Sequence, residues 1–319
     1  MRCLYCGREM SGKISEMERE SGWHKRCVKA FFGTNTMPVL DLTEEGLLQL
    51  AVRMTGKGLT VPGVQKKLSL HLSQDPDCRF TIVDYPTGYI LKPQTSEYPY
   101  LPEYEDLVMR QAKIAGIRTV PHALIRMGSE NAYITRRVDR QIGQGQVQMY
   151  AMEDFCQLSG RLTEDKYKGS YERCSDLIPQ YSMHPGLDLA EFYLRIVFSF
   201  ITGNSDMHLK NFSLREMTPG KRDFVLSDAY DLLPVNIVLP ADKDQTALTL
   251  NGKKRNLRKK DFIVLARRCD LTEKTALRMI AGLIGKREKL AQQIDASFLP
   301  ESEKEKMREL MKDRIEVLM

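Results

Sequence analysis

The chain has 319 residues, 28% of them charged and 42% hydrophobic, and a formal net charge of +6 at neutral pH. This length supports one large domain of two lobes or two modest domains, and the mild positive charge permits an anionic partner without requiring one. No stretch approaches the roughly 20 apolar residues of a membrane span, the start lacks a signal-peptide core, and the seven irregularly spaced cysteines fit a reducing compartment, so we expect a cytoplasmic protein with no membrane association.

Residues 1–38 form a separate Cys/His module by composition, and the boundary falls at Pro38 because the residue before a proline resists helix. Large aromatic side chains lie within it, at Trp23, Phe31 and Phe32. They predict that the module packs onto the rest of the protein rather than binding nucleic acid.

The same module carries two pairs of metal-ligand residues, Cys3 with Cys6 and His24 with Cys27. Two chelating pairs separated by a short loop suit tetrahedral Zn²⁺, and four protein ligands leave no open position, so such a zinc would be structural. The alternative is that the pairs are incidental, since small buried cysteines need no metal.

Residues 39–152 have the pattern of a lobe rich in strands. The spacing of apolar residues predicts a helix over 43–54 and another over 103–115 that Gly116 closes. Short apolar or alternating runs predict strands over 68–72, 89–92 and 132–135. Strands, one helix and further strands predict a small lobe built on a mixed sheet.

Residues 153–319 change to a helical pattern. The run 187–201 is apolar on most sides, which predicts a buried helix that ends at Gly203. Residues 261–293 and 301–318 predict two more helices, the first opened by Asp261.

Asp206 and Asn211 stand five residues apart, and Asp231 follows an apolar strand over 224–226. Phosphoryl transfer needs a carboxylate to orient a hydroxyl and oxygen ligands for Mg²⁺, and Asp-x-x-x-x-Asn is the spacing of a kinase catalytic loop. Taken alone the pair is weak evidence, since turns also collect Asp and Asn.

Two upstream features complete the order that a kinase requires. The segment 56–67 concentrates glycines and lysines before a strand, so its backbone N–H groups could approach phosphates, although a flexible hairpin has the same composition. Lys92 ends an apolar strand, where it could contact nucleotide phosphates while Glu105 fixes its ammonium group. The alternative for Lys92 is an edge-strand lysine that prevents aggregation.

The basic run 253–260 follows a predicted strand and tight turn at residues 248–252. Charge runs are most often solvated loops, which is the reading we favour. The alternative is a docking patch for a substrate that carries RNA.

Several segments match one known family in order. They are residues 60–67, 90–93, 137–140, 153–157, 168–172, 203–213 and 229–231. From roughly Thr43 to the C-terminus the chain thereby resembles the HipA serine/threonine kinase toxins. The resemblance implies an α+β, two-lobed protein-kinase-like fold with a mixed-sheet N-lobe over 39–152 and a helical C-lobe over 153–319. It also implies ATP and Mg²⁺ as cofactors, and growth arrest through phosphorylation of an aminoacyl-tRNA synthetase.

The resemblance assigns roles in the C-lobe. Asp206 resembles the family's catalytic base, and Asn211 and Asp231 resemble its metal ligands, which also contact the cofactor. His208 matches a histidine near the phosphates, although it could equally brace the loop backbone. Glu153 and Phe155 match the segment between the lobes, whose backbone would meet adenine.

Further roles fall in the N-lobe. Lys92, supported by Glu105, resembles the lysine on the nucleotide phosphates. The resemblance also implies that the glycine-rich segment contacts the cofactor, at Gly63, Val64 and Gln65. Thr60 falls where the family carries a hydroxyl residue whose autophosphorylation silences the enzyme.

Two residues depart from the pattern of the family. Pro62 stands where the short HipT branch can carry a second serine, and Asp228, which we take as a turn residue rather than a third acid, stands where the family usually has proline. The chain is also short for a full HipA, which carries a further N-terminal subdomain, and in this it resembles the HipT branch. HipT implies a small HipS-like antitoxin and a HipB-like DNA-binding partner, with no direct DNA binding by this chain, and suggests tryptophanyl-tRNA synthetase as substrate, a choice that no residue here encodes.

Two other classes of function stay open at this stage. One is a catalytically weak binding protein with the kinase fold, and the other is a zinc-containing nucleic-acid-binding regulator. The presence of Asp206, Asn211, Asp231 and Lys92 together favours the enzyme.

Overall fold

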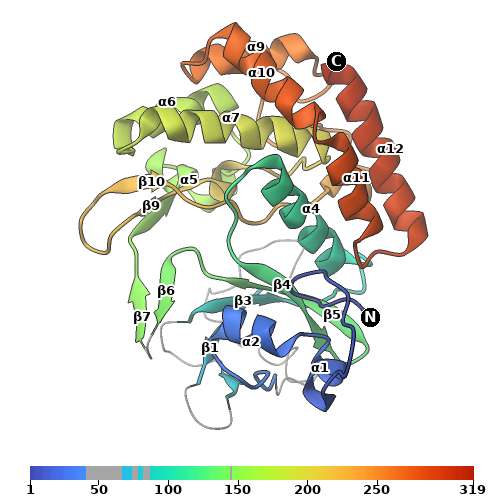
Figure 1. The fold of residues 1–319 in the computed structure, drawn as a ribbon. Coiled ribbons are helices and arrows are strands. Elements are labelled where there is room, and N and C mark those ends of the chain that lie inside the picture. The colour runs from blue at the N-terminus through green and yellow to red at the C-terminus, as the bar shows by residue number, and fades with distance from the viewer. Residues whose placement is uncertain (41–66, 74–77, 82–86, 144–145) are drawn as a thin grey trace. The chain divides into compact units, whose positions relative to one another are not determined.

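The computed structural model describes residues 1–40, 67–73, 78–81, 87–143 and 146–319 (Figure 1). The chain divides into two compact units, Met1–Asp106 with Pro121–Met149, and Leu107–Val120 with Tyr150–Met319. The predicted helix over 43–54 lies outside the described residues. So do the first eleven residues of the glycine-rich segment 56–67, with Thr60, Gly63, Val64 and Gln65.

The first unit is built on a five-stranded sheet with the order β2-β1-β3-β5-β4. Its strands are β1 (Leu68–Leu72), β2 (Phe80–Thr81), β3 (Tyr89–Lys92), β4 (His122–Met127) and β5 (Glu130–Arg136). The three strands predicted in this region are therefore confirmed, the last as part of β5.

The prediction of a mixed sheet is wrong, because every pair of neighbouring strands in this sheet is antiparallel. The helical connection from β3 to β4 would give a parallel pair if these strands were neighbours. Instead β5 returns from β4 through a tight turn at Gly128 (φ +62°) and inserts between them. Hairpin pairing thus replaces the parallel contact.

Two short helices precede the sheet, α1 (Glu16–Ser21) and α2 (Lys25–Phe32). The indole Nε1 of Trp23 donates to the carbonyl of Leu124 on β4 at 3.0 Å. The rings of Phe31 and Phe32 lie 6.0 and 5.7 Å from that of Tyr89 on β3. The predicted packing of the N-terminal module is therefore confirmed.

A two-stranded antiparallel ribbon of β6 (Arg140–Gly143) and β7 (Gln146–Met149) completes this unit.

Helix α4 (Leu101–Ala115) confirms the predicted helix over 103–115. It ends where predicted, since Gly116 adopts φ +95°, a left-handed conformation that favours glycine. Its residues up to Asp106 belong to the first unit and those from Leu107 to the second.

The second unit combines a small antiparallel sheet with helices. The sheet has the order β10-β9-β8, from β8 (Met152–Asp154), β9 (Ser213–Glu216) and β10 (Phe224–Leu226). The short helices are α5 (Phe155–Leu158), α8 (Val235–Val238) and the 3₁₀ turns η1 (Thr163–Asp165) and η2 (Leu209–Asn211). The longer ones are α6 (Tyr171–Tyr181), α7 (Pro185–Ile201), α9 (Lys259–Arg268), α10 (Glu273–Ile284), α11 (Arg287–Asp295) and α12 (Glu301–Leu318) (Figure 1).

Helix α7 confirms the predicted buried helix, with Phe192, Phe198 and Phe200 fully buried. The prediction of one helix over 261–293 is wrong, because α9, α10 and α11 occupy this region. Asp270 adopts φ +54°, and the side chain of Thr272 caps α10 by accepting from the Thr275 amide. A left-handed residue followed by a new N-cap ends a helix even where apolar spacing continues. The last predicted helix is confirmed as α12, and no helix in the described ranges is long and apolar enough to cross a membrane.

Candidate active site

The candidate catalytic loop leaves the end of α7 at Gly203, which adopts φ +70°. A Cβ atom at this position would lie 2.4 Å from Cδ2 of Leu310 on α12, well inside van der Waals contact. Glycine is therefore required twice, for its conformation and for the close approach. The next residue is held by a hydrogen bond of 2.8 Å from the Asn204 amide to the Ser199 carbonyl.

The half-buried carboxylate of Asp206 accepts a hydrogen bond of 2.7 Å at Oδ1 from the hydroxyl of Tyr167. Its own amide donates to Oδ1 of Asn204 at 3.2 Å. Tyr167 is 44% exposed, so the contact lies where a second hydroxyl can reach it. Sequence reasoning missed Tyr167, although it immediately precedes the segment 168–172 that matches the family.

Asn211 ends the short helix η2 and is 5% exposed. Its side-chain nitrogen Nδ2 donates to the backbone carbonyl of Asp206 at 2.8 Å. Since the nitrogen is used inside the loop, the amide oxygen Oδ1 is the atom suited to a cation, and Mg²⁺ prefers such oxygens. One bond thus couples a candidate metal ligand to the candidate base.

Asp231 follows β10 and adopts φ +58°, in the left-handed region that is uncommon outside glycine. The backbone at Ala229, two residues before Asp231, forms two hydrogen bonds with the segment after α4. The Ala229 N–H donates to the Arg118 carbonyl (2.7 Å), and the Val120 N–H donates to the Ala229 carbonyl (3.1 Å). The backbone two residues before Asp231 is therefore fixed against the segment that follows α4.

A set of carboxylates surrounds Tyr167. Burial raises the pKa of Tyr167, and the negative charges of Asp206, Asp242 and Asp231 raise it further. Asp242 was not predicted, and it accepts a hydrogen bond of 2.7 Å from the hydroxyl of Ser205. No sequence signal marks it, since it lies in an irregular loop far along the chain. The charges of Asp206 and Asp231 therefore both raise the pKa of the Tyr167 hydroxyl.

His208 is 6% exposed and lies inside the loop. Its amide donates to the Asp206 carbonyl at 2.8 Å, and its carbonyl accepts from the Asn211 amide at 3.0 Å. Burial lowers the pKa of His208, and the charge of Asp206 opposes this only in part. The imidazole is therefore neutral near pH 7, and the backbone of His208 braces the loop, while a contact with phosphate stays a prediction.

The segment Glu153–Phe155 is tied to the catalytic loop from the other side. Lys210 on η2 forms an ion pair of 2.7 Å with Asp154, and the Phe155 amide donates to the Phe212 carbonyl at 2.9 Å. The ring of Phe155 is fully buried and stacks on that of Phe212 at 5.6 Å. Phe155 therefore serves the core of this unit, and Glu153 is exposed on β8.

In the first unit, Nζ of Lys92 lies 2.5 Å from Oε1 of Glu105, and the two residues are only 3% and 1% exposed. The ammonium group also lies 5.3 Å from the centre of the Tyr133 ring. Lys92 belongs to β3, which lies between β1 and β5 in the sheet. The alternative of an edge-strand lysine is therefore wrong, and the predicted Lys92–Glu105 pair is formed.

Two charged loops hold features that the sequence left open, namely Asp228 and the basic run 253–260. Asp228 faces Arg118, with Oδ1 4.0 Å from Nη1. In the basic run, Lys253 pairs with Asp261 at 2.9 Å and Arg255 with Asp244 at 2.6 Å. These pairs neutralise part of the run and favour a folded surface loop over a docking patch.

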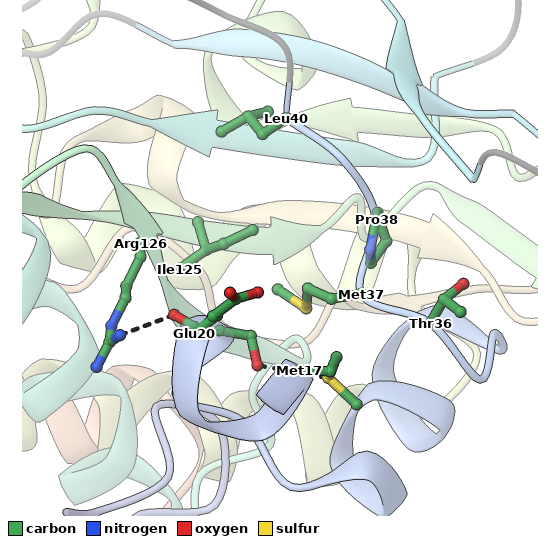
Figure 2. Close-up of a pocket in the computed structure, with 9 residues that line it drawn as sticks. Met17, Glu20, Thr36, Met37, Pro38, Leu40, Ile125 and Arg126 are labelled. Carbon is green, nitrogen blue, oxygen red and sulfur yellow. Dashed lines mark hydrogen bonds between the residues drawn. The ribbon is translucent and has the colours of Figure 1, made fainter. Parts of the chain in front are cut away.

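A pocket of about 380 Å³ lies in the first unit, between α1, residues 36–40 and β4. Figure 2 shows Arg126, which donates to the backbone carbonyl of Glu20 at 2.7 Å, and also Met37 and Pro38 among the other residues that line the pocket. None of the predicted site residues lines it. The pocket belongs to the contact between the N-terminal module and the sheet.

Comparison with known proteins identifies the family of this chain and proteins of similar sequence. A family model described as "HipA-like C-terminal domain" matches residues 59–293. A Haemophilus influenzae protein described as a candidate kinase is 26% identical over 270 residues, covering 77% of both chains. Two Sinorhizobium fredii proteins described in the same way are 30% and 32% identical, over 56% and 68% of this chain. The chain spans only 43% and 55% of the length of these two.

Two solved structures have similar folds. HipA of Shewanella oneidensis MR-1, solved with HipB and operator DNA, has a TM-score of 0.70 and 20% identity, covering 81% of this chain and 64% of that chain. The Helicobacter pylori proinflammatory kinase CtkA has a TM-score of 0.53 and 16% identity, covering 75% of this chain and 90% of that one. The predicted α+β, kinase-like fold is therefore confirmed.

Proposed function

This chain belongs to the HipA-like C-terminal domain family, and from that premise we propose that it is an ATP-dependent protein kinase. One observation carries the proposal. The hydrogen bond from the Asn211 side chain to the Asp206 backbone fixes a candidate metal ligand beside a candidate base. The bond uses the amide nitrogen of Asn211 and leaves its oxygen for a cation, which is the ligand that phosphoryl transfer needs for Mg²⁺.

Asp206 acts as the base in this proposal. The hydroxyl oxygen of the substrate forms a bond to the γ-phosphorus of ATP, the bond from that phosphorus to the β–γ bridging oxygen breaks, and ADP leaves with the electron pair. Asp206 accepts the hydroxyl proton. Asn211 Oδ1 and the Asp231 carboxylate would hold Mg²⁺, and the ion would neutralise negative charge on the phosphates.

Lys92 binds the nucleotide phosphates in this proposal, and Glu105 keeps its ammonium group in place. The separation of 2.5 Å and the burial of both residues support the role given to Glu105, because a buried charge is retained only where it is paired. The backbone around Glu153 and the glycine-rich segment with Gly63, Val64 and Gln65 contribute further nucleotide contacts by resemblance to the family.

The finer assignments extend the same proposal. We place the chain in the HipT branch, as a serine/threonine kinase toxin that autophosphorylates at Thr60 and arrests growth. Its substrate is an aminoacyl-tRNA synthetase, and tryptophanyl-tRNA synthetase is the first candidate to test. Its location is the cytoplasm. A HipS-like antitoxin and a HipB-like DNA-binding protein are its partners, and the Shewanella HipA was itself solved with HipB and operator DNA.

Transfer of labelled γ-phosphate from ATP tests the proposal. The wild-type protein incorporates label into itself or into a lysate protein in the presence of Mg²⁺, and the Asp231→Asn variant loses most of it because an amide binds Mg²⁺ less well than a carboxylate. Asp223→Asn, a surface aspartate of the β9–β10 turn, is the control and retains the label. Equal labelling by Asp231→Asn and wild type would refute the metal assignment, and growth arrest that persists in Asp231→Asn would separate toxicity from kinase chemistry.

A further inference from the structure

Four side chains of the N-terminal module converge although the proposed kinase chemistry does not use them. The ligand atoms of Cys3, Cys6, His24 and Cys27 all lie within 4.8 Å of one another. In the described part of the chain they form the one group of three or more such residues with this proximity. The two pairs are separated by the 17 residues between Cys6 and His24, so folding brings them together.

Two tight local structures present these side chains. Cys3 and Cys6 lie on a turn closed by bonds from Cys3 N–H to the Arg8 carbonyl (2.9 Å) and from Gly7 N–H to the Cys3 carbonyl (2.8 Å). Gly7 adopts φ +71°, which favours glycine. His24 is the N-cap residue of α2, and Cys27 lies one turn into that helix. Each pair of side chains therefore projects toward the other from a short segment that backbone hydrogen bonds fix.

The distances fit tetrahedral coordination. Zinc bonds of about 2.3 Å to sulfur and about 2.1 Å to nitrogen place a sulfur and a nitrogen ligand about 3.5 Å apart. His24 Nδ1 lies 3.4 Å from Cys6 Sγ and 3.7 Å from Cys27 Sγ. The ligand nitrogen of His24 is therefore Nδ1.

A metal-free cluster of thiols explains this geometry less well. Nδ1 of a neutral imidazole has one lone pair or one hydrogen, whereas two sulfurs lie within 3.7 Å of it. The third sulfur, Cys3 Sγ, accepts a hydrogen bond from the backbone amide of His24 at 3.4 Å. Such amide bonds around a metal site are the usual support for its ligands.

We propose that Cys3, Cys6, Cys27 and Nδ1 of His24 bind one structural Zn²⁺. Three thiolates and an imidazole suit zinc, and four protein ligands close the coordination so that no water is activated there. The site goes beyond the proposed kinase function, because none of the phosphoryl-transfer residues takes part.

The zinc holds the module on the sheet of the first unit. Trp23, next to ligand His24, bonds to the Leu124 carbonyl on β4, and the Leu124 amide donates to the carbonyl of Leu4 beside ligand Cys3 (3.3 Å). At the far end of α2, the guanidinium of Arg136 on β5 donates from Nε to the Phe31 carbonyl at 2.9 Å. Contacts to two strands of the sheet therefore depend on segments that the metal orders.

Metal analysis of the purified full-length chain tests the site. We expect about one zinc per chain in the wild type and less than about 0.1 in Cys6→Ser, which changes a partly exposed ligand and so limits the damage to folding. Cys78→Ser, a buried cysteine of the same unit outside the cluster, is the matched control and keeps the full zinc content.

A second measurement does not depend on any variant. Treatment of the wild type with a strong chelator should release the zinc and lower the melting temperature, and added Zn²⁺ should restore both. Wild-type protein without zinc, iron in its place, or full zinc content in Cys6→Ser would each overturn the proposal. Zinc content is measured independently of phosphate transfer, so this result and the test of the kinase proposal are separate.

Discussion

The hydroxyl of Tyr167 donates a hydrogen bond of 2.7 Å to Oδ1 of Asp206. Tyr167 is held near the loop from its own side, because the Leu209 amide on η2 donates to the carbonyl of Lys166 at 3.1 Å. The rings of Tyr167 and His208 also meet edge to face at 5.1 Å. The orientation of the proposed base thus depends on a residue outside its own loop.

We expect Tyr167→Phe to lower kcat about tenfold, because one hydrogen bond to a charged group is worth about 1.5 kcal/mol. The KM for ATP should stay unchanged, since the contact is to the base and not to a phosphate ligand. Tyr181→Phe, which changes a tyrosine of similar exposure, is the control. A rise in kcat for Tyr167→Phe would mean that Tyr167 blocks the base rather than orienting it.

The Lys92–Glu105 pair should stabilise the first unit as well as bind phosphate. Lys92→Met leaves Glu105 buried without this partner, and we expect a loss of about 3 kcal/mol in the free energy of unfolding together with weaker ATP binding. Lys168→Met removes a pair of the same 2.5 Å separation to Asp165, but Lys168 has a side chain that is 76% exposed. That control should change stability by less than about 1 kcal/mol in urea titrations. Equal losses in the two variants would contradict the role given to burial.

Gly203 makes a sharp test of the loop geometry. Gly203→Ala introduces strain at φ +70° and a clash with Leu310, so we expect a loss of about 2–4 kcal/mol in stability and reduced phosphate transfer. Gly220→Ala has nearly the same backbone conformation (φ +74°) but open space around its Cβ position, and should lose only about 1 kcal/mol. Similar thermal stability of the two variants would show that α12 does not approach the loop closely.

The buried His208 should make stability depend on pH. Its pKa is lowered in the folded state, so the unfolded chain binds the extra proton as the pH falls below its ordinary pKa of about 6.5. The contribution is therefore present above about pH 6.5 and is lost on acidification. We expect the drop in melting temperature from pH 7.5 to 5.5 to be smaller in His208→Gln than in wild type. His184→Gln, an exposed histidine, should keep the wild-type drop, and an unchanged drop in His208→Gln would contradict the burial argument.

Regular elements could be predicted from the sequence where one local signal decides. Apolar spacing with a closing glycine was enough for α4, and an apolar run was enough for α7 and β10. The separation of α9, α10 and α11 was missed because apolar spacing continues across Asp270. The identity of this residue alone does not predict that its backbone adopts the left-handed conformation that ends α9. The antiparallel sheet was missed because the insertion of β5 between β3 and β4 is a choice of tertiary pairing.

The candidate site divides in the same way. The Asp206–Asn211 pair follows from its spacing, and the Lys92–Glu105 pair follows from a lysine at a strand end with a glutamate on the next helix. The structure forms a bond within each pair. Tyr167 and Asp242 were missed because their contacts to Asp206 and Ser205 join distant segments through single hydrogen bonds. Only the fold brings such partners together.

The most direct test of the account compares the wild type with Asp206→Asn for phosphate transfer and for nucleotide binding on the same preparations. Removal of the base should reduce transfer of labelled γ-phosphate at least about 100-fold, while the Mg-ATP dissociation constant stays within about threefold because the phosphate and metal ligands are unchanged. The melting temperature of the variant establishes that it is folded. Transfer at the wild-type rate by folded Asp206→Asn protein would contradict the assignment of this loop as the catalytic centre.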